Sequence, residues 1–107
     1  MRTTLLTLAF ALASAGTAKA QAPAADGKAL FEKNCRKCHG DGQPSPGIKK
    51  LFPEIPIWDE AFFAKRTEAD IVAVLTNGKG KNMKPWKEVL SAEEMAAIAK
   101  YIRTLRP

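Results

Sequence analysis

The segment CRKCHG, from Cys35 to Gly40, contains both cysteines and the only histidine of this 107-residue chain. The two cysteines are three positions apart, and His39 directly follows Cys38. In a helix, side chains at positions i, i+3 and i+4 lie on one face. The two thiols and the imidazole can therefore reach one ligand together.

Three other uses of a C-x-x-C pair agree less well with the sequence. A disulfide between Cys35 and Cys38 would close a very small loop and would stabilise the fold little. A thioredoxin-like dithiol needs a βαβ context, whereas the flanking segments have a helical pattern and no alternating strand pattern. A structural zinc site needs four ligands, and two cysteines with one histidine are too few.

The pattern C-x-x-C-H is instead typical of the attachment site of a c-type haem. Cys35 and Cys38 would each bond one vinyl group of the porphyrin. His39, on the same helical face, would place a ring nitrogen on the iron as the proximal axial ligand. The sequence thus predicts one covalently attached haem c, with its iron as the metal.

The first twenty residues, MRTTLLTLAFALASAGTAKA, have the features of a secretory signal peptide. Arg2 gives a positive start, Leu5–Gly16 is apolar, and Ala18–Ala20 fits a small-x-small cleavage site. The apolar run is shorter than the ~20 residues that span a membrane. We therefore expect a cleaved signal at 1–20, a mature domain at 21–107 without a transmembrane segment, and a periplasmic location.

The net charge argues against nucleic acid as a partner. The whole chain has a formal charge of +6, and removal of Arg2 and Lys19 with the signal lowers it to +4. This charge is modest, and no interleaving of aromatic and basic residues marks a nucleic-acid-binding surface.

The mature chain reads as helices separated by loops, with no strand pattern. Side chains that can cap helices precede the apolar-periodic segments, and a capping box is expected at Thr67 with Asp70 and at Ser91 with Glu94. The segment 41–56, in which glycine and proline recur, is predicted to be an irregular loop. The predicted helices run from Asp26 through Cys35 to Gly40, over 59–65, over 68–76, and from Ser91 to about Leu105.

These features together resemble a small, soluble, bacterial class I c-type cytochrome with one haem. The resemblance is carried by Gly27, Phe31, the CRKCHG motif, a proline-rich loop, a methionine in a Gly/Lys/Pro loop and a last helix containing Tyr101. It implies an all-α fold in which the N- and C-terminal helices cross. One or two shorter helices and Pro/Gly-rich loops would wrap around the haem. Gly27 and Phe31 would lie at the crossing, packed against Ile98 and Tyr101.

The chain has no second histidine, so Met83 and Met95 are the candidates for the second axial ligand of the iron, with a deprotonated lysine near Met83 or an open sixth site as the alternatives. Met95 belongs to an apolar helical stripe, which usually forms core. Met83 lies in a glycine-containing loop and is the residue that the family pattern selects. We therefore expect Met83 as the distal ligand and Met95 in the core.

The sequence leaves alternatives for the other contacts of the haem. A proximal histidine usually donates its other ring N–H to a carbonyl or carboxylate. The family uses a proline-loop carbonyl, which would be Pro46, with Pro44 as the alternative. Trp58 and Trp86 each offer one N–H donor, so each either contacts a haem propionate or packs on the porphyrin.

The haem would also complete a core that a chain of this length can barely form alone. We expect the apoprotein to be poorly folded. Five apolar residues are expected to cover the porphyrin: Phe31, Phe52, Phe62, Leu75 and Ile98.

The resemblance implies a one-electron carrier that exchanges electrons with a redox protein donor and acceptor, and not an enzyme. Two alternatives are an electron-accepting subunit of a periplasmic dehydrogenase, and a haem sensor or peroxidase-like protein with an open iron site. Four lysines near Met83 would form either a positive rim for docking of the redox partners or a merely solvated loop: Lys79, Lys81, Lys84 and Lys87.

Overall fold

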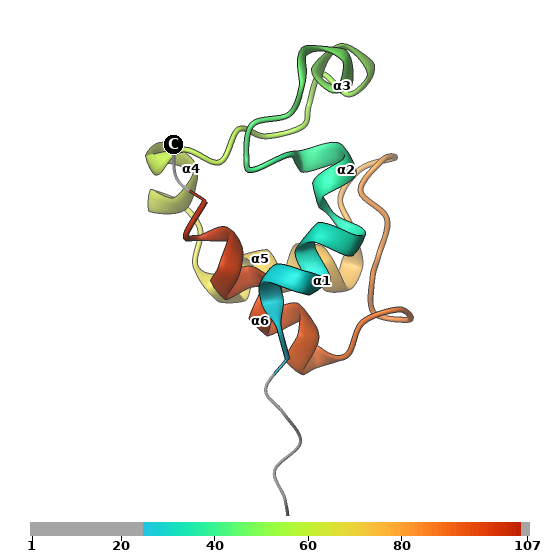
Figure 1. The fold of residues 1–107 in the computed structure, drawn as a ribbon, viewed down its shortest axis with the longest axis vertical. Helices are drawn as coiled ribbons and strands as arrows, with labels where there is room; N and C mark the ends of the chain where they lie inside the picture. Colours follow the sequence, from blue (N-terminus) through green and yellow to red (C-terminus); the bar gives the residue numbers. More distant parts are fainter. Residues whose placement is uncertain (1–24, 106–107) are drawn as a thin grey trace, which may run out of the picture.

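The computed structural model describes residues 25–105, and the predicted signal peptide at 1–20 lies outside this range. Within 25–105 the chain is helical, and its only strand-like feature is an isolated bridge between Lys79 and Met83. The predicted all-α class is thus confirmed. The helices are α1 (Gly27–Asn34), α2 (Arg36–His39), α3 (Pro46–Leu51), α4 (Glu60–Ala64), α5 (Glu68–Asn77) and α6 (Ala92–Ile102) (Figure 1).

The first and last of these helices pack across each other, as expected for the family (Figure 1). Phe31 of α1 and Ile98 of α6 are the most completely buried large side chains, and the Tyr101 ring lies tilted against Phe31, with centroids 5.4 Å apart and planes inclined by 56°. A Cβ atom at Gly27 would lie 2.7 Å from the carbonyl carbon of Ala97 and closer still to its oxygen. Glycine at position 27 therefore sets how closely the two helices approach.

Gly27→Ala is expected to destabilise the protein, because the added methyl group overlaps the backbone of α6. Overpacking of this kind costs about 1–3 kcal/mol or more. The matched control is Gly47→Ala in α3, where a Cβ meets nothing within 4 Å and where alanine is the better helix former. Denaturant unfolding of both haem-containing variants measures the difference. Equal stabilities would mean that the crossing does not depend on Gly27.

The helix starts follow the local capping chemistry. Asp26 and Asp59 each accept a hydrogen bond from a backbone N–H of the first turn of α1 and α4. Both predicted capping boxes are present. The Thr67 and Ser91 hydroxyls accept from the third helical N–H, and the carboxylates of Asp70 and Glu94 at that third position accept from the backbone N–H of the cap residue. Each box satisfies two backbone donors that helix geometry leaves unpaired.

The structure corrects three sequence-based boundaries. The predicted helix from Asp26 to Gly40 is interrupted at Cys35, so α1 and α2 are separate. The predicted loop at 41–56 contains α3, because Ser45 caps it and Pro46 occupies its first turn, where a missing N–H costs nothing. The last helix ends at Ile102, three positions before Leu105.

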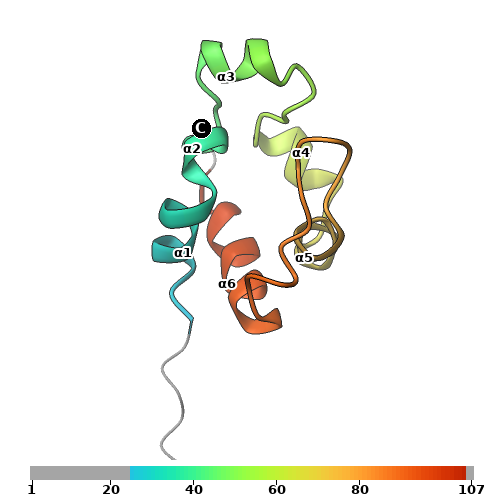
Figure 2. The same ribbon diagram turned by 90° about the vertical axis from the view of Figure 1, so that its right-hand side faces the viewer.

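The helices divide into two sides. Figure 2 shows α1 and α2 on one side of the molecule, and α4, α5 and the orange segment 78–86 on the other, with α6 packed against both α1 and α5. Helix α3 lies at the end of the molecule away from the α1–α6 crossing (Figures 1 and 2). None of the helices within 25–105 is long and apolar enough to span a membrane.

Candidate functional site

A cavity of about 640 Å³ lies between the two sides of the molecule. Apolar side chains dominate its lining, as in most sites for organic ligands. The five residues predicted to cover a porphyrin all line it: Phe31, Phe52, Phe62, Leu75 and Ile98. These five residues are part of the apolar lining, and their contact with a porphyrin stays a prediction.

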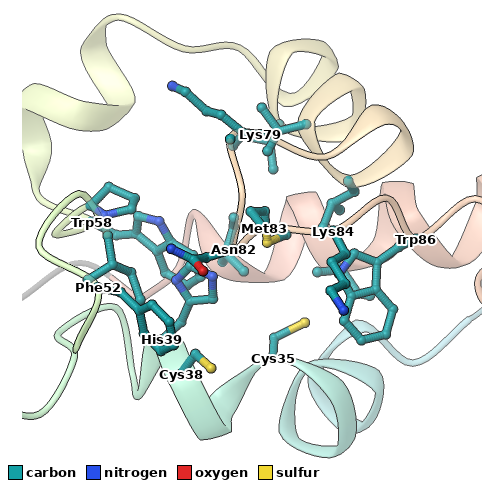
Figure 3. A pocket seen from close by; sticks show the side chains of 18 of the residues that line it. Cys35, Cys38, His39, Phe52, Trp58, Lys79, Asn82, Met83, Lys84 and Trp86 are labelled. Carbon is teal, nitrogen blue, oxygen red and sulfur yellow. The ribbon is translucent and has the colours of Figure 1, made fainter. Parts of the chain in front are cut away.

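One wall of the cavity carries the CRKCHG motif. Cys35 is the residue that joins α1 to α2, and Cys38 follows in α2, so both thiols face the cavity (Figure 3). Both cysteines are free, so the alternative of a disulfide is not realised. Burial, with a smaller contribution from Cys38, raises the pKa of the Cys35 thiol to about 11. A redox-active C-x-x-C pair instead has a lowered thiol pKa.

His39 lies on the same wall and is held by an aromatic contact. Its ring stacks on Trp58, with centroids 4.7 Å apart and planes inclined by 16°. Burial lowers the pKa of His39, which favours the neutral imidazole that binds metals. Its Nδ1 atom is buried and has no hydrogen-bond partner within the part of the chain that the structure describes.

The opposite wall carries Met83, which faces the motif across the cavity (Figure 3). Two backbone hydrogen bonds fix the segment around it: Lys79 N–H donates to the Met83 carbonyl, and Trp86 N–H donates to the Leu75 carbonyl, both at 2.7 Å. Gly78 ends α5 with φ of 74°, a conformation that favours glycine. Helix α5 therefore anchors both ends of the segment that carries Met83.

Met95 is placed elsewhere, as the sequence predicted. Its side chain is buried in the core cluster and does not line the cavity. The Thr76 hydroxyl contacts its sulfur at 3.7 Å. Of the two methionines within 25–105, only Met83 borders the cavity.

Of the remaining predicted site residues, Trp58 and Trp86 line the cavity and Pro46 does not. The Trp58 ring stacks on His39 and also lies tilted against Phe31, with 5.8 Å between centroids. Pro46 does not reach His39: it is exposed in the first turn of α3, and no hydrogen bond reaches Nδ1 within 25–105. The prediction of Pro46 as the partner of His39 is therefore not met here, because the loop that carries it folds into a helix that lies apart.

Polar residues that the sequence did not single out also border the cavity. Asn82 donates to the Glu54 carboxylate at 2.7 Å, across 28 positions of sequence. The guanidinium of Arg66 lies over the Phe62 ring, 4.1 Å from its centroid. Only the position of Asn82 next to Met83 could have drawn attention to it, and nothing local marks Glu54 or Arg66.

The chemistry of these side chains fits a covalently held metalloporphyrin. Two free thiols and a neutral imidazole face a thioether across a large apolar cavity. Within 25–105, no three His, Cys, Asp or Glu side chains are grouped to hold a bare metal ion. The two thiols, the imidazole, the thioether and the apolar lining together suit a metal carried by an organic ring.

Comparison of the sequence with known proteins agrees with this chemistry. Residues 22–102 match the family described as cytochrome C oxidase, cbb3-type, subunit III. A cbb3-type cytochrome c oxidase subunit FixP from Bradyrhizobium sp. is 32% identical over 85 residues, which cover 77% of this chain and 27% of that protein. Cytochrome c6 from Synechocystis sp. is 34% identical over 93 residues, which cover 83% of this chain and 71% of that protein. The chain spans only 27% to 33% of its FixP and CcoP relatives.

Solved structures give the same answer for the fold. A c-type cytochrome, KustC0563, superimposes with a TM-score of 0.68 at 30% identity, covering 77% of this chain and 99% of that one. Cytochrome c6C from Synechococcus sp. gives a TM-score of 0.55 at 29% identity, covering 74% and 92%. The motif, the cavity and these similarities lead to one conclusion. The chain belongs to the c-type cytochromes, in the family described as cytochrome C oxidase, cbb3-type, subunit III.

Proposed function

We propose that this protein is a periplasmic one-electron carrier whose haem is ligated by His39 and Met83. The observation that carries the proposal is the placement of Met83 on the wall opposite Cys35, Cys38 and His39 (Figure 3). Members of the c-type cytochrome family carry covalently bound haem c. The iron of that group supplies the redox chemistry by accepting and releasing one electron, and a methionine ligand raises its potential.

The side chains of the cavity each have a defined task in this proposal. The Cys35 and Cys38 thiols would hold the haem covalently, and the neutral His39 ring would bind the iron. Trp58, stacked on that ring, orients it in place of the expected carbonyl partner. Two protein ligands would leave no position open for substrate or gas, which suits electron carriage better than sensing or peroxidase-like chemistry.

Export to the periplasm is part of the proposal and rests on the predicted signal peptide at 1–20. An exported chain would expose its domain, 21–107, to periplasmic redox partners. The predicted size and charge of that domain fit a diffusing carrier.

A second candidate is a subunit of a larger redox complex. The family description and the FixP and CcoP relatives favour this reading, because their names are those of oxidase subunits. A subunit of a periplasmic dehydrogenase would show the same site. In either case, the domain would receive or deliver electrons within a stable assembly.

Purification of the native protein separates these candidates. A carrier is expected to purify from the cell extract as a single polypeptide without a bound partner. It should exchange one electron reversibly in a spectroelectrochemical titration. Its reduced form is expected to bind CO slowly. Co-purification with an oxidase or dehydrogenase would favour the subunit, and rapid CO binding to the unmodified protein would favour a sensor or peroxidase-like protein.

We also propose a positive docking rim for an acidic redox partner. Lys79 and Lys84 line the cavity, and both side chains are exposed. Lys81 and Lys87 are exposed in or next to the same segment but do not line the cavity. Positive charge around the place where electrons leave would steer and orient a negatively charged partner.

The rim predicts a specific dependence on salt. Replacing Lys79 and Lys84 with glutamine should lower the bimolecular electron-transfer rate at low salt and flatten its decline with ionic strength. Charges are screened over about 10 Å at 0.1 M salt. The control replaces Lys28 and Lys100, which are exposed and do not line the cavity, and changes the net charge equally. If both double variants respond alike in stopped-flow measurements with the partner, net charge rather than a rim is responsible.

A further inference from the structure

The side chains of Glu54 and Asn82 join the two loops that border the cavity. Asn82 Nδ2 donates to Glu54 Oε1 at 2.7 Å. Both residues line the cavity, and Asn82 directly precedes Met83. Figure 3 shows the Asn82 side chain next to Met83, extending toward the wall that carries Phe52 and Trp58.

This contact is the only hydrogen bond within 25–105 that ties the segment 78–86 to the segment 41–58. The other bonds that hold the Met83 segment are local: Lys79 bonds Met83 itself, and Trp86 bonds Leu75 at the end of α5. These local bonds fix the shape of the segment and its attachment to α5. They do not tie the segment 78–86 to the segment 41–58.

The acceptor, the Glu54 carboxylate, is kept charged and is carried by a segment that is itself held in place. The backbone N–H of Glu54 and the Asn82 amide both lower the pKa of the Glu54 carboxyl, and Lys49 acts in the same direction. Lys49 also holds the loop itself, since its ammonium group donates to the Ile55 carbonyl at 2.6 Å. A charged acceptor strengthens a hydrogen bond, and a fixed loop loses less entropy on making it.

We propose that the Glu54–Asn82 hydrogen bond is a clasp that holds Met83 against the haem and limits access of exogenous ligands to the iron. The inference rests on the proposed ligation by Met83. Glu54 and Asn82 act as positioning residues, because neither is assigned to the iron. Opening of the segment 78–86 would require the clasp to break, whereas the local bonds of Lys79 and Trp86 could stay intact.

The experiment uses CO as the probe and the reduced haem-containing protein. At saturating CO, the binding rate is limited by the release of Met83. Glu54→Ala and Asn82→Ala are each expected to raise this limiting rate by about 2- to 10-fold, the effect of one hydrogen bond. The double variant is expected to be no faster than the faster single variant, because both changes remove the same contact.

Two control variants separate the loss of the Glu54–Asn82 contact from the loss of a negative charge. Glu54→Gln keeps a side-chain oxygen that accepts from Asn82 but removes the charge that strengthens the bond, so its rate should lie between those of the wild type and of Glu54→Ala. Glu88→Ala removes an exposed carboxylate that follows Met83 in the sequence and does not line the cavity, and it should have no effect. Wild-type rates in the alanine variants, additive effects in the double variant, or an equal increase with Glu54→Gln would each overturn the clasp.

A Met83→Ala arm separates this inference from the ligation on which it rests. If that variant binds CO no faster than the wild type, ligation by Met83 fails and the clasp fails with it. If it binds CO much faster while Glu54→Ala and Asn82→Ala match the wild type, the ligation stands and the clasp alone is wrong.

Discussion

Replacing Cys35 and Cys38 together with alanine is expected to yield a chain that holds no covalent haem and is largely unfolded. The reason lies in the size of the cavity relative to the stability of a small domain. Without a ligand, the apolar lining of a cavity of about 640 Å³ would be exposed to water. A whole domain is stable by only ~5–15 kcal/mol, so this chain has little reserve against the loss.

Acid–acetone extraction and circular dichroism measure the two effects. The wild-type protein should keep its haem through extraction, whereas the double variant should lose it together with most of its helical signal. Lys37→Ala is the matched control, because Lys37 is exposed between the two cysteines and should leave both properties unchanged. A double variant that retains haem through extraction would show that the attachment lies elsewhere.

Met83→Ala is expected to open the iron to CO, whereas Met95→Ala should mainly lower the free energy of unfolding. Met83 borders the cavity, and its loss would remove the proposed ligand and lower the reduction potential. The CO-binding rate of the Met83 variant should rise by more than about tenfold, since loss of an iron ligand exceeds 1.4 kcal/mol.

The Met95 variant provides the contrast. Met95 is buried in the core and contacts Thr76, so its truncation should cost about 2–5 kcal/mol. Its potential and CO-binding rate should stay close to those of the wild type. The assignment of the two methionines would have to be exchanged if Met95→Ala opened the iron and Met83→Ala only destabilised the fold.

The parts of the fold that the sequence predicted well are those set by neighbouring residues. The capping boxes at Thr67 and Ser91 depend on side chains three positions apart, and both are present in the structure. The core position of Met95 followed from its helical stripe. The close approach at Gly27 was expected from the family, and the backbone of Ala97 shows why glycine is needed there.

The parts that the sequence did not predict depend on longer range or on an ambiguous signal. Pro46 was read as a loop residue, although proline also fits the first turn of a helix, and Ser45 caps that helix. The stacking of Trp58 on His39 and the bond between Asn82 and Glu54 join segments that are distant in sequence. No local pattern encodes such pairs, because they form only when separate loops come together.

The placement of the two walls also sets an order of assembly. One wall comes from the contiguous residues 35–39, which need no tertiary structure to lie near one another. The other comes from 78–86, which is far from 35–39 in the sequence and lies across the cavity only in the folded chain. If haem is attached at the first wall as proposed, the attachment could precede folding, and binding of Met83 would then be an intramolecular event at high effective concentration. Because the chain has a single histidine, no second imidazole can compete during that search.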